Sequence, residues 1–162
     1  MTQKSSLVYS GKLYLTANDK TFVTYNSASK YLFKLIASIL CVENFSSSKL
    51  PTYVMLYQAT KDALIQKPDV RLHKNSELLN RFVDITRYTT DSGDTVDSNF
   101  ISTIYSSMLL SATYQPVVVT LALVGQDKSE ILAAVEFNKD VYDIIRSGSQ
   151  AQLKWVLTIS NS

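Results

Sequence analysis

Three stretches in the last third of the chain decide the predicted fold: PVVVTLALV at residues 116–124, EILAAVEFN at 130–138 and QLKWVLTIS at 152–160. Apolar residues recur at every second position, which is the period with which side chains alternate across a β-strand. Trp155, for example, is in phase with Leu153 and Leu157 and is therefore expected in the core. Because turn-forming residues separate the stretches, we expect three successive strands joined by turns.

Length and composition indicate one globular domain over residues 1–162, with Met1–Ser6 as an N-terminal arm. The chain has 162 residues, of which 46% are hydrophobic, enough to bury a sizeable core. Its 16 Lys and Arg nearly balance 14 Asp and Glu, for a net charge of +2. The basic residues are scattered, so the basic stripe of a nucleic-acid binder is absent from the sequence.

Membrane insertion and secretion are not expected. The apolar run Tyr31–Val42 is too short to span a bilayer, and it contains Lys34. Residues 1–10 lack the pattern of a signal peptide, which indicates synthesis and assembly in a cytoplasm. The single cysteine, Cys41, excludes an intramolecular disulfide and a cysteine-cluster metal site, and it is expected to pack in the core.

The first half of the chain predicts a β-hairpin followed by a helix. Residues 7–15 alternate as a strand at or near a sheet edge, and Gly11 stands where a bulge could bend it. Turn residues at 18–20 lead to a second extended segment, and apolar residues at helical spacing predict a helix over Ser29–Val42. The further expected elements are a strand at 52–58, a helical turn at 61–66 ended by Pro68, a polar connection over the rest of 59–80, strands at 81–90 and 100–110, and a turn at 91–94.

Together these elements predict an α+β fold that is mainly β: an antiparallel β-sandwich with one packed α-helix in the N-terminal third.

No pattern in the sequence indicates catalysis or a cofactor. His73 has no second histidine or cysteine nearby and is expected at the surface. Asp91, Asp94 and Asp97 lack the ligand spacing of a calcium loop and are interpreted as a solvated turn. The carboxylates that a glycosidase pair would need are dispersed, namely Glu43, Glu77, Asp84, Glu130 and Glu136. We therefore expect no catalytic residue, metal site or cofactor.

Ten tyrosines are many for this length, and several fall on or beside expected strands. An exposed tyrosine ring buries a large area in a complex while its hydroxyl stays hydrogen-bonded. The candidate interface residues are Tyr53, Tyr57, His73, Tyr88, Tyr105 and Tyr114. Half-buried tyrosines within a sheet are the alternative interpretation.

The order of elements resembles that of small structural proteins of tailed bacteriophages, of the tail-fibre, baseplate and collar type. The resemblance covers Gly11 to Asn161 and lies in four features: the strand with Gly11, Asn26 ahead of a helix, a strand beginning Pro-Thr-Tyr at 51–53, and the final pair LAAVEF at 132–137 and LKWVLTI at 153–159. The chain departs from the pattern at TLAL, residues 120–123, and at Gln152-Leu153 ahead of the tryptophan.

This resemblance implies a non-enzymatic virion structural protein, a tail, baseplate or collar component or a fibre adaptor, that assembles in multiple copies. Its expected partners are copies of itself and other virion proteins, after synthesis in the host cytoplasm and with no nucleic acid or membrane. The expected contact regions are residues 1–6, 59–80 and 91–99. The alternatives are a capsid or head decoration protein, a carbohydrate-binding module that contacts a host-surface glycan, and a glycan hydrolase with two close carboxylates.

Overall fold

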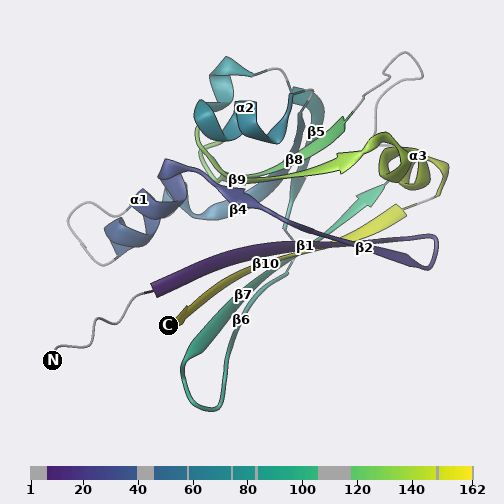
Figure 1. Ribbon diagram of the computed structural model, residues 1–162. Helices are drawn as coiled ribbons and strands as arrows, with labels where there is room; N and C mark the ends of the chain where they lie inside the picture. The colour runs from purple at the N-terminus through teal and green to yellow at the C-terminus, as the bar shows by residue number, and fades with distance from the viewer. Residues whose placement is uncertain are drawn as a thin grey trace, which may run out of the picture.

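Two antiparallel sheets face each other across one hydrophobic core in the computed structural model, which describes residues 7–39, 46–57, 59–73, 75–82, 84–105, 118–148 and 150–161 (Figure 1). The strands are β1 (Leu7–Ala17), β2 (Lys20–Tyr25), β3 (Ser27–Ala28), β4 (Pro51–Tyr57), β5 (Asn75–Arg81), β6 (Asp84–Thr89), β7 (Thr95–Tyr105), β8 (Val118–Gly125), β9 (Ile131–Asn138) and β10 (Gln150–Asn161). The helices are α1 (Lys30–Ile39), α2 (Lys61–Gln66) and α3 (Lys139–Ser147), with short 3-10 turns η2 (Ser47–Lys49) and η3 (Val70–Leu72). The predicted mainly-β sandwich is confirmed.

Sheet A has the strand order β2-β1-β10-β7-β6. Its centre joins the two ends of the described chain, because β1 pairs with β10 from Leu7↔Asn161 to Thr16↔Gln152. The β1–β2 turn occurs where it was expected, and both Asn18 and Asp19 have positive φ, as the tight turn of a two-residue hairpin requires. In phase with the predicted alternation, Trp155 is fully buried.

Gly11 lies within β1 without a bulge, because the pairing of β1 with β10 runs through it in unbroken register. The expected bend at this position was therefore wrong. The glycine instead makes room for the Asn26 side chain: a Cβ atom at residue 11 would lie 1.5 Å from Asn26 Oδ1. The Asn26 backbone N–H donates to the Gly11 carbonyl, which holds the two segments together.

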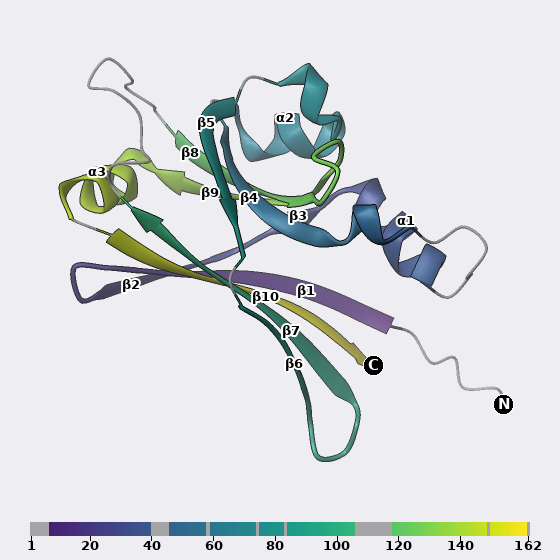
Figure 2. The ribbon, with the colours of Figure 1, turned by 180° about the vertical axis from the view of Figure 1, so that it is seen from behind.

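Sheet B has the order β3-β9-β8-β4-β5 and buries both of its faces. In β8, Leu121 and Leu123 face sheet A, whereas Ala122 and Val124 contribute to a second cluster under α2. Figures 1 and 2 show α2 over the side of sheet B that is turned away from sheet A. The single buried face expected over 116–124 and 130–138 was therefore wrong, because both phases of β8 and β9 are buried, Thr120 included.

The chain passes from sheet B to sheet A at Phe82, so the single strand predicted over 81–90 was wrong. Strand β5 ends at Arg81, and β6 begins at Asp84 in the other sheet. Phe82 is buried between them, where its N–H donates to the Thr52 carbonyl and its ring lies edge-on to Phe100. The polar connection expected before it also contains a strand, β5, and the turn η3.

Helix α3 was also not expected from the sequence. It begins after Asn138, whose side chain accepts from the Val141 N–H, and it ends at Gly148. Val141, Tyr142 and Ile145 are buried against the core. The segment was expected to be a turn, although an N-cap asparagine and a C-terminal glycine are ordinary helix signals.

Several expectations concern residues outside the described ranges. These are the arm Met1–Ser6, the last residues of the helix expected to Val42 with Cys41, Gln58 at the end of a strand, residues 106–110 of the strand expected to Leu110, Tyr114, and residues 116–117.

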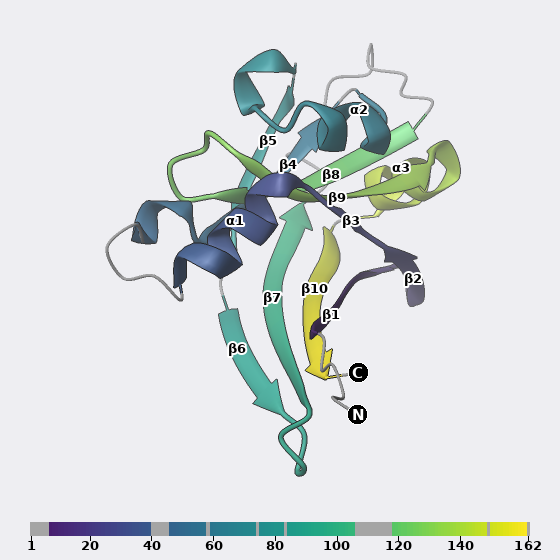
Figure 3. The same cartoon turned by 60° about the vertical axis from the view of Figure 1, so that its left-hand side comes forward.

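An ionic contact fixes η2 to the β8–β9 turn, which lie side by side in Figure 3. Lys49 Nζ lies 2.7 Å from Asp127 and 3.3 Å from Glu130. Hydrogen bonding to Asp127 raises the pKa of Lys49. Burial alone would raise the pKa of Asp127, but bonds from Lys49 and Ser129 outweigh it and lower that pKa.

We expect Asp127→Asn to reduce the free energy of unfolding by no more than about 1 kcal/mol at neutral pH, because the pair is partly solvated. A carboxyl with a depressed folded-state pKa stabilises the fold above its unfolded value of about 3.9, and this contribution is lost as pH falls through the folded-state value. Urea unfolding of both proteins should therefore show a difference at neutral pH that vanishes in acid. A difference that grows in acid would contradict this assignment.

Candidate binding surface

The face of sheet A that points away from sheet B is uncovered by any described element. The helices contact mainly sheet B. Their contacts with sheet A, from α3 to β10 and Asn18 and from Phe33 of α1 to Tyr9, do not involve its outward face. Figures 1 and 2 show the helices above or beside the sandwich and none below sheet A. We call the outward side chains of sheet A the open face. It is formed by even-numbered residues of β1 and β10 together with the residues paired to them.

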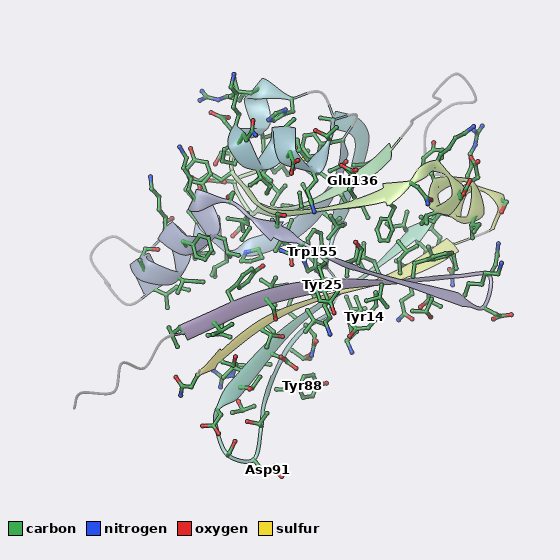
Figure 4. All side chains as sticks on the ribbon, in the orientation of Figure 1. Tyr14, Tyr25, Tyr88, Asp91, Glu136 and Trp155 are labelled. Carbon is green, nitrogen blue, oxygen red and sulfur yellow. The ribbon has the colours of Figure 1, made fainter. Side chains whose placement is uncertain are left out.

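Four tyrosines contribute to the open face: Tyr14, Tyr25, Tyr88 and Tyr105. Tyr25, Tyr88 and Tyr105 are 63%, 60% and 50% exposed, and Tyr14 is partly buried. Figure 4 labels Tyr14 and Tyr88 on the lower side of sheet A, away from sheet B. Exposed rings of this size on a regular sheet offer apolar area that is not used in the core.

Lysines pair with two of these rings across neighbouring strands. Lys12 faces Tyr25, with its Nζ 5.3 Å from the ring centroid, and Lys154 faces Tyr14 at 5.8 Å. A cation over an aromatic face is attracted by the ring quadrupole, and the pair also restricts the ring's freedom. The rings therefore hold an ordered position before any partner arrives.

Polar groups occur between the rings of the open face. Thr158 Oγ1 donates to Asp97 Oδ1 at 2.7 Å, across the β10–β7 pair, and Tyr88 lies opposite Asp97 on β6. Aromatic rings mixed with hydroxyls and a few charges are typical of protein–protein interfaces, whose overall polarity resembles that of ordinary surface. The surface is therefore chemically suited to a protein partner.

The structure divides the predicted interface residues between two regions. Tyr88 and Tyr105 lie on the open face, whereas Tyr53, Tyr57 and His73 lie on the side of sheet B that carries α2. Tyr14 and Tyr25 were not among the predicted interface residues. The outward position of Tyr14 could have been predicted, because Leu13 and Leu15, which flank it in β1, alternate with it and are buried.

Tyr57 is fully buried, so its selection as a contact residue does not hold. Its burial raises the pKa of the phenol. The His73 ring lies edge-on to it at 6.2 Å, and His73 Nε2 is 2.6 Å from the Lys67 carbonyl oxygen. Tyr53 is partly buried, with Lys128 Nζ 4.9 Å from its ring. These residues stabilise the layer under α2, and Tyr114 lies outside the described residues.

The carboxylates proposed as a hydrolase pair serve structural contacts where their side chains are described. Glu136 accepts from the backbone N–H of Lys61 at the start of α2, and Glu130 pairs with Lys49. Glu130 and Glu136 are six positions apart along an extended segment, which corresponds to a distance of about 20 Å at strand geometry. The two carboxyls of a glycosidase lie about 5–10 Å apart, so this pair does not fit that reaction.

Asp91 and Asp94 are exposed at the β6–β7 turn, as expected of a solvated turn. The same expectation was wrong for Asp97, which lies on β7, is partly buried and accepts a hydrogen bond from Thr158. No cluster of three or more His, Cys, Asp or Glu side chains able to hold a metal occurs among the residues that the structure describes. Nor does any described helix combine the length and apolar character needed to cross a membrane.

Comparison with protein-family models, with curated proteins and with solved structures finds no match to this chain.

Proposed function

We propose that this protein is a non-enzymatic structural protein that assembles through the open face of sheet A, with copies of itself and with other proteins of a particle. The observation that carries the proposal is the unequal covering of the two sheets. Sheet B is covered by α2, whereas sheet A leaves four tyrosines outward. Exposed aromatic rings interspersed with polar groups, on a sheet face that no described helix covers, are typical of protein–protein interfaces.

A tailed-bacteriophage particle, in its tail, baseplate or collar, is the setting we propose. The support for it is the resemblance of the element order from Gly11 to Asn161, together with a rigid sandwich suited to repeated copies. The β6–β7 hairpin extends beyond the body of the sandwich in Figure 1 and gives such a component a second projecting contact region. In a symmetric assembly each copy would bury the same surface, so one altered face would affect every contact.

The proposal is tested by replacing Tyr25 and Tyr88 together with serine. Because both side chains are mostly exposed, we expect little change in the free energy of unfolding, within about 0.5 kcal/mol for each substitution. Light scattering over a range of concentrations should show an oligomer for the unchanged protein and a shift towards monomer for the variant. A hot-spot aromatic residue contributes about 2 kcal/mol or more, so even one such residue among the two raises the dissociation constant at least about 30-fold.

Phe33→Ser on α1 is the matched control, since Phe33 is an exposed aromatic residue away from the open face. It should leave the oligomer unchanged. A chain that is monomeric at all concentrations, or a Phe33 variant that dissociates as much as the tyrosine variant, would overturn assembly through this face.

A further inference from the structure

A polar hollow surrounds Tyr31, in the first turn of α1, on a part of the molecule that the open face does not include. Tyr31 lines three adjoining depressions of about 170, 360 and 370 Å³. We call them together the Tyr31 groove. Its walls come from four parts of the chain: α1, Lys49 of η2, the segment Gln66–Leu72 that contains η3, and Ser129 and Glu130 at the end of the β8–β9 turn.

Positive charge dominates the lining of the groove. Five basic side chains line it and two acidic ones, Asp69 and Glu130, an excess of three positive charges. The basic residues are Lys30, Lys34, Lys49, Lys67 and Arg71. The whole chain carries a net charge of only +2, so positive charge is concentrated at this place. The groove therefore favours an anionic ligand.

Two of these basic side chains, Lys49 and Arg71, already form ion pairs with carboxylates of the protein. Lys49 bridges Asp127 and Glu130, and Arg71 forms a forked contact with Asp69 at 2.7 and 3.1 Å. Hydrogen bonding from Arg71 lowers the pKa of Asp69 to about 2, so this pair stays charged. The outer side of the Arg71 guanidinium remains exposed to solvent.

The other three cations are open to a ligand. Lys30, Lys34 and Lys67 are exposed, and no described carboxylate lies within 4.0 Å of any of them. Lys30 Nζ and Lys34 Nζ are 5.3 and 5.6 Å from the centroid of the Tyr31 ring. Tyr31 itself is partly buried and packs against the core. This packing holds its ring in place beside the two ammonium groups.

From this arrangement we propose that the Tyr31 groove binds an acidic saccharide, a sugar chain that carries carboxylate groups. The C–H face of a sugar ring packs on the tyrosine ring, and its carboxylate pairs with the lysine ammonium groups. Sugar hydroxyls find hydrogen-bonding partners in Gln66, Ser129 and the groove carboxylates. Three shallow depressions in series suit several sugar units better than one compact anion.

An acidic peptide fits the same surface less well. Extended peptides add to a free sheet edge or insert apolar side chains into pockets. The described lining comes from helices and turns and offers no free sheet edge, and its apolar residues, Leu35, Pro68 and Leu72, are interspersed with charged side chains. We therefore treat binding of acidic peptides as the contrary outcome of the test.

The experiment is calorimetric or NMR titration of the full chain with two pairs of probes: 3′-sialyllactose against lactose, and trigalacturonate against maltotriose. Each acidic sugar is expected to bind, and its neutral counterpart to bind at least about tenfold more weakly, the effect of losing one charge-assisted hydrogen bond. Binding of either acidic sugar supports the proposal, because the lining of the groove defines a class of ligand, acidic saccharides, and not one particular sugar.

The double variant Lys30→Ala/Lys34→Ala should weaken binding of the acidic sugar at least about tenfold without changing the urea midpoint, since both side chains are exposed. Lys20→Ala/Lys139→Ala is the matched control, because it removes equal charge from two exposed lysines that belong neither to the groove nor to the open face. The proposal is overturned if neither acidic sugar binds, if the control weakens binding as much, or if hexaglutamate binds as tightly as the sugars.

Discussion

Replacing Trp155 with alanine should destabilise the protein by about 3–5 kcal/mol, the usual cost of truncating a large buried aromatic side chain. Trp155 is fully buried and lies at the centre of sheet A, opposite Leu13 on one neighbouring strand and Phe100 on the other. Both sheets contribute to the core that it fills. Such a loss is a large part of the stability of an ordinary domain, so the variant should be close to unfolding.

Urea unfolding followed by far-ultraviolet circular dichroism is the appropriate measurement, because these variants lack the chain's one tryptophan. Trp155→Phe keeps much of the volume and removes the indole N–H, which is buried without a hydrogen-bond partner among the described residues. It should therefore cost much less than alanine, even if the alanine variant does not fold. Lys154→Ala, on the exposed side of the same strand, is the control and should be nearly neutral. Equal losses for phenylalanine and alanine would contradict the cavity argument.

Gly11→Ala should destabilise the protein by about 2–3 kcal/mol, in the upper part of the range for overpacking. The added methyl would lie within the Asn26 amide, and the backbone hydrogen bond of Asn26 to Gly11 prevents the two segments from separating. The amide must then leave its place and lose its bond to the Tyr9 hydroxyl, which has a length of 2.7 Å.

A double-mutant cycle separates this clash from other effects of alanine. Asn26→Gly alone should cost about 1 kcal/mol through the lost hydrogen bond. Combined with Gly11→Ala it should be more stable than Gly11→Ala alone, because the obstructing side chain is gone. Gly93→Ala is a useful comparison: its φ is positive and nothing lies within 4 Å of the added carbon, so only conformational strain acts there. Additive effects of the two changes at residues 11 and 26 would show that they do not meet.

The sequence predicted the sandwich because strands of sheet A alternate clearly. Leu13, Leu15 and Trp155 point into the core, while Lys12 and Lys154 between them point out. Sheet B is different, because α2 buries its second face. Tyr57 is buried because α2 packs over it. Alternation within the strand does not show that a helix covers this face, so it could not predict the burial of Tyr57.

Other differences have local causes that the sequence did contain. The helix α3 has its cap at Asn138, an acidic residue in the first turn and Arg146 in the last, which is the ordinary distribution of charge along a helix. It was missed because the segment was interpreted as a turn between two strands. The open face was predicted in part, through Tyr88 and Tyr105, because exposure of a strand residue follows from its phase once the core side is known.

The Tyr31 groove was not predictable from any local pattern. Its lining combines α1 with residues near position 70 and near position 130, and only the packing of sheet B brings them together. Each of its lysines, taken alone in the sequence, has the character of an ordinary solvated side chain. Lys30 and Lys34 flank Tyr31 within α1, but only the folded chain brings them together with Lys49, Lys67 and Arg71.

The pairing of β1 with β10 also determines when the open face can exist. Strand β1 precedes β10, its neighbour in the middle of sheet A, by more than 130 residues and is therefore synthesised well before it. Tyr14 and Tyr25 therefore have no completed sheet beneath them while the chain is still being synthesised, and such long-range pairings form late. The surface proposed for assembly is therefore complete only after β10 has paired with β1.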